Sequence, residues 1–156
     1  LIHSFYQKTG SFVLRGLYNY RAGQIVPGRF RQHDHTADAY RLLIEQQPGD
    51  ILIVWGQLGR LYRDCSVLRA DELFSGGEFG FDTVANSSII VVHPTRLVRW
   101  EQLHMDCPGD QFSPNAVGRF DNAPVLGFDD GEVRFDTDFA GDANGRYGAA
   151  SGFLPQ

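Results

Sequence analysis

The sequence is poor in lysine, methionine and cysteine, and none of its apolar runs is long. Its one lysine, Lys8, stands against thirteen arginines, and the formal net charge is −5 with an isoelectric point near 5.4. An acidic chain whose arginines are dispersed is a poor match for proteins that coat a nucleic-acid backbone. No run of 18 apolar residues occurs, so the sequence predicts no membrane span.

The chain also lacks the common motifs of enzymes and metal proteins. There is no Walker-type phosphate loop, no Rossmann glycine triplet and no zinc-knuckle spacing. His104 and Asp106 match the H-x-D motif of iron dioxygenases, but those enzymes need a second histidine downstream, and none follows His104. Cys65 and Cys107 allow one disulfide, whose formation the sequence leaves open.

Glycine and aromatic residues are abundant, which points to a β-rich fold. The chain has 18 glycines, seven prolines and 12 phenylalanines in 156 residues, and 42% of its residues are hydrophobic. This composition suits a real core with many turns around it. We therefore predict one domain over residues 1–156, a mainly β, antiparallel β-sandwich, of jelly-roll type, with one or two short helices.

Local patterns predict where some of these elements lie. Residues 51–55 and 88–92 are short apolar runs that predict buried strands, and the second run is the more β-branched. Thr36 is expected to cap a helix over residues 37–46, whose apolar residues recur at helical spacing. Asp130-Gly131 predicts the tight turn of a hairpin between two apolar stretches.

Three segments, taken in order, are similar to strands of known coat proteins. Residues 9–18 follow the G-S-aromatic-x-x-R pattern of an early strand, and residues 75–94 match a late strand that rises from a turn and ends at a proline. Residues 139–155 match a closing strand that follows a G-D pair. Together these segments, about a third of the chain, resemble the jelly-roll capsid proteins of picorna-like viruses, of the dicistrovirus and iflavirus type. The tyrosine that commonly follows the late-strand proline is Thr95 here.

The resemblance implies a structural capsid protein without catalysis, located in the virion. Its partners would be other capsid chains in an icosahedral shell and a host receptor, with no direct nucleic-acid site, no cofactor and no metal. Such proteins are cut from a polyprotein by a protease that favours glutamine before the cut. This chain starts at Leu1 rather than Met and ends at Gln156, so we expect these two residues to be cleavage termini and the domain to lack an N-terminal arm.

Other functions remain open from the residues alone. His33 and His35 on a strand would project both rings to one face and, with His93 or His104, would ligate a metal in a small cupin-like β-barrel enzyme. The acidic, glycine-punctuated stretch from Asp136 to Asn144 would suit a divalent cation. A third alternative is a secreted β-sandwich that binds carbohydrate or protein without catalysis.

Overall fold

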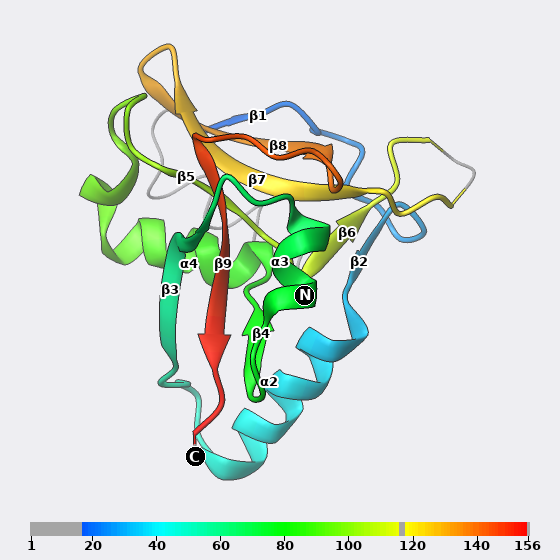
Figure 1. The fold of residues 1–156 in the computed structure, drawn as a ribbon, viewed down its shortest axis with the longest axis vertical. Coiled ribbons are helices and arrows are strands. Elements are labelled where there is room, and N and C mark those ends of the chain that lie inside the picture. Colours follow the sequence, from blue (N-terminus) through cyan, green and yellow to red (C-terminus); the bar gives the residue numbers. More distant parts are fainter. Residues whose placement is uncertain (1–16, 116–117, 156) are drawn as a thin grey trace.

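A mixed, open β-sheet of nine strands organises the described part of the chain (Figure 1). The structure is a computed structural model, in which residues 17–115 and 118–155 are described. Its elements in chain order are β1 (Leu17–Asn19), β2 (Phe30–Gln32), α2 (Asp34–Gln46), β3 (Trp55–Arg63), α3 (Val67–Leu73), β4 (Glu78–Gly80), α4 (Thr83–Val92), the 3-10 helix η1 (Pro94–Leu97), β5 (His104–Asp106), β6 (Asp110–Phe112), β7 (Asn122–Asp129), β8 (Glu132–Phe139) and β9 (Tyr147–Phe153). Strands account for 34% and helices for 25% of the described residues, which confirms the prediction of a mainly β protein.

The order of the strands does not confirm a jelly-roll sandwich. The main path through the sheet is β1-β8-β7-β5-β9-β3, with β6 joining β7 to β2 and β4 pairing with the end of β9. The pairs β1–β8 and β5–β9 are parallel, and the other pairs are antiparallel. A jelly roll consists of two packed sheets of antiparallel strands, whereas these strands are connected in one mixed sheet.

The two faces of the sheet bury different side chains. The main core lies against α4 and η1 and consists of Ile90, Leu97, Met105, Cys107, Leu126, Val133 and Phe135. Because side chains alternate along a strand, Asp106, between two of these core residues, points to the opposite face. One end of that opposite face is covered by α3, whose Val67 packs with Ala123 and Ala140. The candidate site lies on the rest of that face, where β5, β8 and β9 carry Asp106, Asp138 and Tyr147.

The run at residues 88–92, predicted as a strand, is instead the C-terminal half of α4. Asp82 caps this helix, since its Oδ1 accepts a hydrogen bond from the backbone N–H of Ala85 at 2.8 Å. Ile90 is only 1% exposed in the main core, whereas Val92 is 67% exposed. The cap and the burial of one helix face outweigh the β propensity of the run.

The strand predicted at residues 51–55 is also wrong. Residues 51–54 have no regular structure, and β3 begins only at Trp55. Ile51, Ile53 and Trp55 are 80%, 77% and 82% exposed, while Leu52 and Val54 pack on a second apolar cluster that includes Phe79 and Phe81. The segment therefore leaves a row of apolar side chains on the surface.

The expected helix and hairpin are confirmed, with one correction at the helix start. Helix α2 begins at Asp34, and Thr36 lies inside it, where its Oγ1 donates a hydrogen bond to the carbonyl of Gly80 at 3.0 Å. Between β7 and β8, Asp130 and Gly131 have φ values of 49° and 85°. This left-handed conformation at both turn positions matches the twist of a two-residue hairpin.

The predicted cleavage termini lie outside the described residues, whereas the structure does address the disulfide and the membrane span. Leu1, Gln156 and the early part of the first coat-protein segment lie outside, so the cleavage termini remain predictions. Cys65 and Cys107 are both free thiols, so the disulfide that the sequence allowed is not formed. Within residues 17–115 and 118–155, no helix has the length and apolar character needed to cross a membrane.

Candidate functional site

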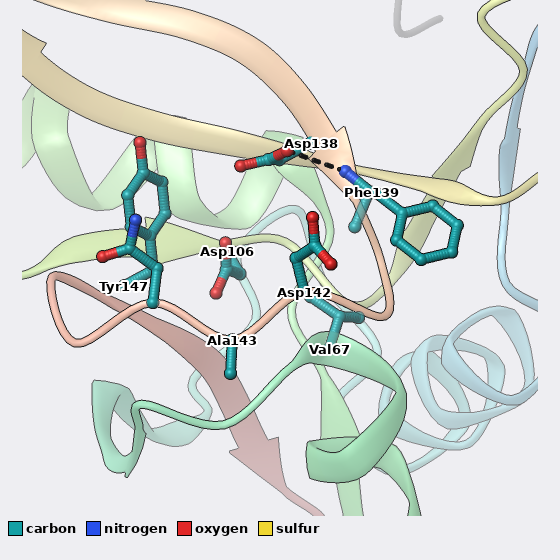
Figure 2. Close-up of a pocket in the computed structure, with 9 residues that line it drawn as sticks. Val67, Asp106, Asp138, Phe139, Asp142, Ala143 and Tyr147 are labelled. Carbon is teal, nitrogen blue, oxygen red and sulfur yellow. Dashed lines mark hydrogen bonds between the residues drawn. The ribbon is translucent and has the colours of Figure 1, made fainter.

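The sheet face opposite the main core carries a pocket whose charged residues are all aspartates. Its volume is about 220 Å³, and we call it the acidic pocket. It is lined by Val67, Asp106, Ala123, Asp138, Phe139, Asp142, Ala143, Asn144 and Tyr147. Figure 2 shows the carboxylates of Asp106, Asp138 and Asp142 around one space, with Tyr147 and Phe139 on either side of it.

Strand pairing brings these aspartates together from distant parts of the sequence. Asp106 ends β5, where it is paired with Val125 of β7 on one side and with Ala149 of β9 on the other. Asp138 is paired with Ala123 of β7. Because directly paired residues point to the same face, the small side chains of both alanines leave room beside the carboxylates.

Asp106 is the buried carboxyl group of this pocket. The residue is 7% exposed, and its carboxylate has no hydrogen-bond or ion-pair partner in the part of the chain that the structure describes. Burial, together with the negative charge of Asp138, raises the pKa of Asp106 to about 7. Burial and the carboxylates of Asp138 and Asp106 also raise the pKa of the Tyr147 hydroxyl.

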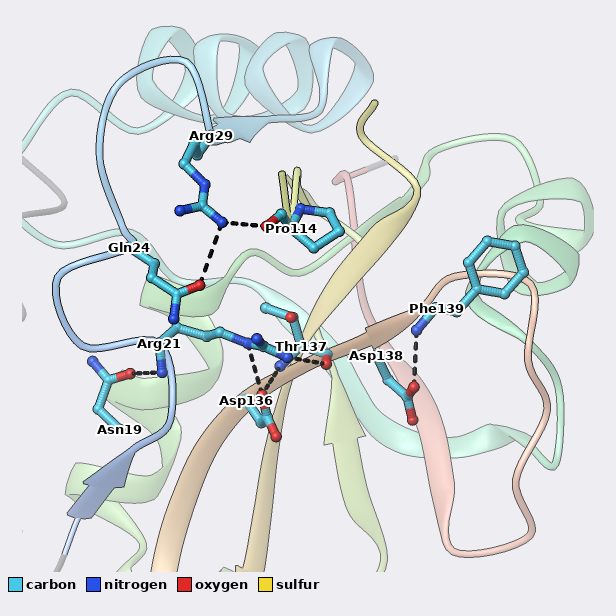
Figure 3. Close-up of polar contacts among 9 residues, drawn as sticks. All are labelled: Asn19, Arg21, Gln24, Arg29, Pro114, Asp136, Thr137, Asp138 and Phe139. Atoms are coloured by element: carbon cyan, nitrogen blue, oxygen red, sulfur yellow. Dashed lines mark hydrogen bonds and ion pairs between the residues drawn. The ribbon is translucent and has the colours of Figure 1, made fainter. Parts of the chain in front are cut away.

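Arg21 forms an ion pair with Asp136, which lies on β8 two residues before Asp138 (Figure 3). It forms no ion pair with the aspartates that line the acidic pocket. Its Nε lies 2.8 Å from Asp136 Oδ1, and its Nη2 donates a hydrogen bond to the carbonyl of Thr137 at 3.2 Å. Within the described ranges, Asp138 and Asp142 have no ion pair, and the carboxylate of Asp138 accepts one hydrogen bond, from the backbone N–H of Phe139. The negative charge of the acidic pocket is therefore not balanced by cationic side chains among the described residues.

A second pocket of about 210 Å³ adjoins the acidic pocket, and we call it the histidine pocket. The two pockets share the wall residues Val67, Ala123 and Phe139. Polar groups in the histidine pocket come from His33, Asp71, Asp110, Gln111, Asp121 and Asn122, and the other walls are mainly apolar. Like its neighbour, it is lined by no arginine or lysine that the structure describes.

Asp110 is a buried lining residue of the histidine pocket, and a backbone hydrogen bond holds its side chain. Its Oδ2 accepts a hydrogen bond from the backbone N–H of Thr83 at 2.7 Å, at the N-terminus of α4, where a negative charge is favourable. Burial and the nearby Asp82 nevertheless raise the pKa of Asp110 to about 7. Burial likewise raises the pKa of Asp71 to about 6 and, together with His35, lowers the pKa of His33.

The histidines of the predicted cupin-like metal site are not assembled into one. His33 is the N-terminal cap residue of α2, and its ring centroid lies 5.8 Å from that of His35. His93 is exposed at the end of α4, and His104 is buried between Trp100 and Tyr147, with ring centroids 5.1 and 4.9 Å away. No group of three or more His, Cys, Asp or Glu residues within the described ranges has the geometry to hold a metal ion.

The acidic stretch from Asp136 to Asn144 contributes to a pocket, although not as a calcium loop. Asp138, Asp142 and Asn144 line the acidic pocket, while Asp136 is paired with Arg21. Sequence reasoning missed Asp106 and Asp110 as pocket residues. They precede and follow the short turn between β5 and β6, and Asp106 was considered only as part of an H-x-D pair that has no second histidine downstream. For Asp106 the visible signal is an aspartate between two apolar residues, Met105 and Cys107.

No protein-family model, no curated protein and no solved structure matches the chain. The two adjoining pockets, with three aspartates on one side and three aspartates and a histidine on the other, are therefore the basis for assigning a function.

Proposed function

We propose that the acidic pocket binds an organic cation, an ammonium or guanidinium group carried on an apolar body. The observation that supports this is Asp106, which is 7% exposed, without a partner among the described residues, and open to a cavity with no cationic wall. A buried carboxylate without a partner destabilises a protein. A bound cation supplies both the charge and the N–H donors that this carboxylate lacks.

An organic cation suits this pocket better than a metal ion does. The carboxylates do not meet in a metal-holding cluster within the residues that the structure covers. Tyr147 and Phe139 provide aromatic wall, and aromatic rings attract organic cations through their electron-rich faces. A primary alkylammonium ion would place its charge between the aspartates and its methylene groups on these rings.

Titration of the protein with butylammonium at pH 8, followed by calorimetry, tests the proposal. We expect saturable binding of butylammonium and none of neutral 1-butanol, which has the same apolar body. Asp106→Asn should weaken butylammonium binding at least about tenfold, or about 1.4 kcal/mol, because the buried charge is lost. Asp38→Asn, an exposed change on α2 away from the pocket, is the matched control and should leave binding unchanged.

Two results would contradict this function. Equal binding of 1-butanol and butylammonium would mean that the pocket selects apolar groups rather than charge. Binding of Ca²⁺ without binding of butylammonium would mean that the aspartates rearrange around a metal ion, the alternative that the sequence leaves open for the stretch from Asp136 to Asn144.

The capsid function, with its shell partners, virion localisation and jelly-roll sandwich, stays a prediction from the sequence resemblance. One feature agrees with it: Ile51, Ile53 and Trp55 are 80%, 77% and 82% exposed, and contiguous exposed apolar side chains are typical of subunit contacts. Light scattering with negative-stain imaging of native material tests it. Regular shells that contain this chain with other chains would support it, and a monomer would contradict it.

A further inference from the structure

Three residues that line the histidine pocket each carry a buried polar atom with no hydrogen-bond partner among the described residues. These atoms are Nδ1 of His33, Oδ1 of Asp110 and Oδ1 of Asp121, and they come from three separate segments of the chain. Asp110 is 1% exposed. A buried polar atom left unpaired costs on the order of 1–3 kcal/mol, so folded proteins keep few of them without a functional reason.

Two of these three atoms are carboxylate oxygens, which call for a ligand that donates hydrogen bonds. The nearest cation to Asp121 is the exposed Arg119, whose Nε is 3.8 Å from Oδ2 rather than from the unpaired Oδ1. Asp110 uses Oδ2 for the backbone of Thr83, which leaves Oδ1 buried and without a hydrogen-bond partner among the described residues. An ammonium group carries three donors and a positive charge, which are what unpaired carboxylate oxygens require.

The histidine pocket and the acidic pocket share an apolar wall. Val67, Ala123 and Phe139 line both pockets, and Phe139 is 48% exposed, so part of its ring is accessible to a ligand. The order along the surface is thus carboxylates, apolar wall and carboxylates again. This order matches a molecule with a cationic group at each end of a methylene chain.

We propose that the two pockets together bind one elongated dication of the α,ω-diamine class. One ammonium group pairs with Asp106 and its neighbours, the methylene chain lies on Phe139, and the second ammonium group pairs with Asp110 and Asp121. This proposal rests on the function proposed above for the acidic pocket and adds the second anchoring point. Because the two ends are linked, the second contact forms within one complex and strengthens binding without a second association step.

A length series of alkyl amines tests the proposal. Calorimetry at pH 8 would compare 1,3-diaminopropane, 1,5-diaminopentane and 1,8-diaminooctane with monoamines of the same carbon number. We expect one diamine to bind at least tenfold more tightly than its matched monoamine, with weaker binding of shorter and longer diamines. Asp121→Asn should remove most of this advantage, measured as the ratio of diamine to monoamine affinity, and Asp110→Asn provides a second test in case one variant folds poorly.

The outcomes separate this inference from the proposed function. If monoamines bind and no diamine of any length binds more tightly, the acidic pocket acts alone and the dication proposal is wrong. If the advantage of the best diamine survives both Asp110→Asn and Asp121→Asn, the second ammonium group lies elsewhere, which also overturns it. If neither monoamines nor diamines bind, both the proposed function and this inference fail.

Discussion

Replacement of Gly148 by alanine is expected to lower the free energy of unfolding by about 3 kcal/mol or more. Gly148 of β9 lies against Gly59 of β3, and a Cβ at either position would collide with the backbone carbonyl of the other. Gly59 also has a φ of +88°, which side-chain-bearing residues rarely adopt. Because backbone atoms cannot move aside as a flexible side chain can, the two strands would have to separate.

Urea denaturation followed by circular dichroism measures this effect. Gly76→Ala is the control, since a Cβ at Gly76 meets nothing within 4 Å and its φ is not positive. This control should change stability by less than about 0.5 kcal/mol, as most open surface substitutions do. A cooperative transition for Gly148→Ala that matches the Gly76→Ala variant would mean that β3 and β9 are not packed as described.

The same pair of glycines is important for the site. Gly148 follows Tyr147, a wall of the acidic pocket, and precedes Ala149, which is paired with Asp106. A shift of β9 would therefore move the pocket as well as the sheet. Gly148→Ala should lose butylammonium binding even under conditions in which the variant remains folded.

Local signals in the sequence predicted the hairpin and helix α2, because both depend on neighbouring residues. The turn at Asp130-Gly131 needs two residues that tolerate a left-handed backbone, and these residue types favour it at that position. Residues 88–92 misled prediction, because their β-branched side chains favour a strand when considered alone. The cap at Asp82 and the burial of Ile90 make this segment a helix. Of these two causes, only the capping residue can be read from the neighbouring sequence.

The candidate site was less predictable than the fold, since strand pairing assembles it over long sequence distances. Asp106 and Asp138 are 32 positions apart and meet because β7 lies between their strands. Parallel pairing of β5 with β9 adds Tyr147 and the loop before it. The sequence singled out the stretch from Asp136 to Asn144 as acidic, but nothing in its spacing indicated a buried partner at Asp106.

Stability is expected to fall as the pH rises from about 4 to about 7, because of Asp106 and Asp110. Burial raises the pKa of each carboxyl group to about 7 in the folded protein, against 3.8 for a free aspartate. Between these values the folded state holds more protons than the unfolded state, so the free energy of unfolding decreases with increasing pH. Each group contributes a loss on the order of 2–4 kcal/mol across this range, which levels off above the folded pKa.

Urea titrations at pH 5 and pH 8 check this expectation. Asp106→Asn and Asp110→Asn should each reduce the stability difference between the two pH values, since an amide does not ionise. Asp38→Asn, which changes an exposed carboxylate on α2, should leave that difference unchanged. Equal pH dependence in the parent protein and in all three variants would mean that neither buried carboxyl group keeps its proton in the folded state.

The same ionisation links stability to the proposed ligand. An alkylammonium ion pairs with the ionised form of Asp106, so binding below pH 7 requires the release of a proton from a group whose pKa is about 7. The affinity for butylammonium should therefore rise about tenfold from pH 6 to pH 8 and then become constant. Bound ligand should raise the melting temperature more at pH 8 than at pH 6, where the carboxyl group is mostly neutral. In Asp106→Asn any residual binding should lose this pH dependence, which distinguishes a cation held by Asp106 from one held by the exposed aspartates alone.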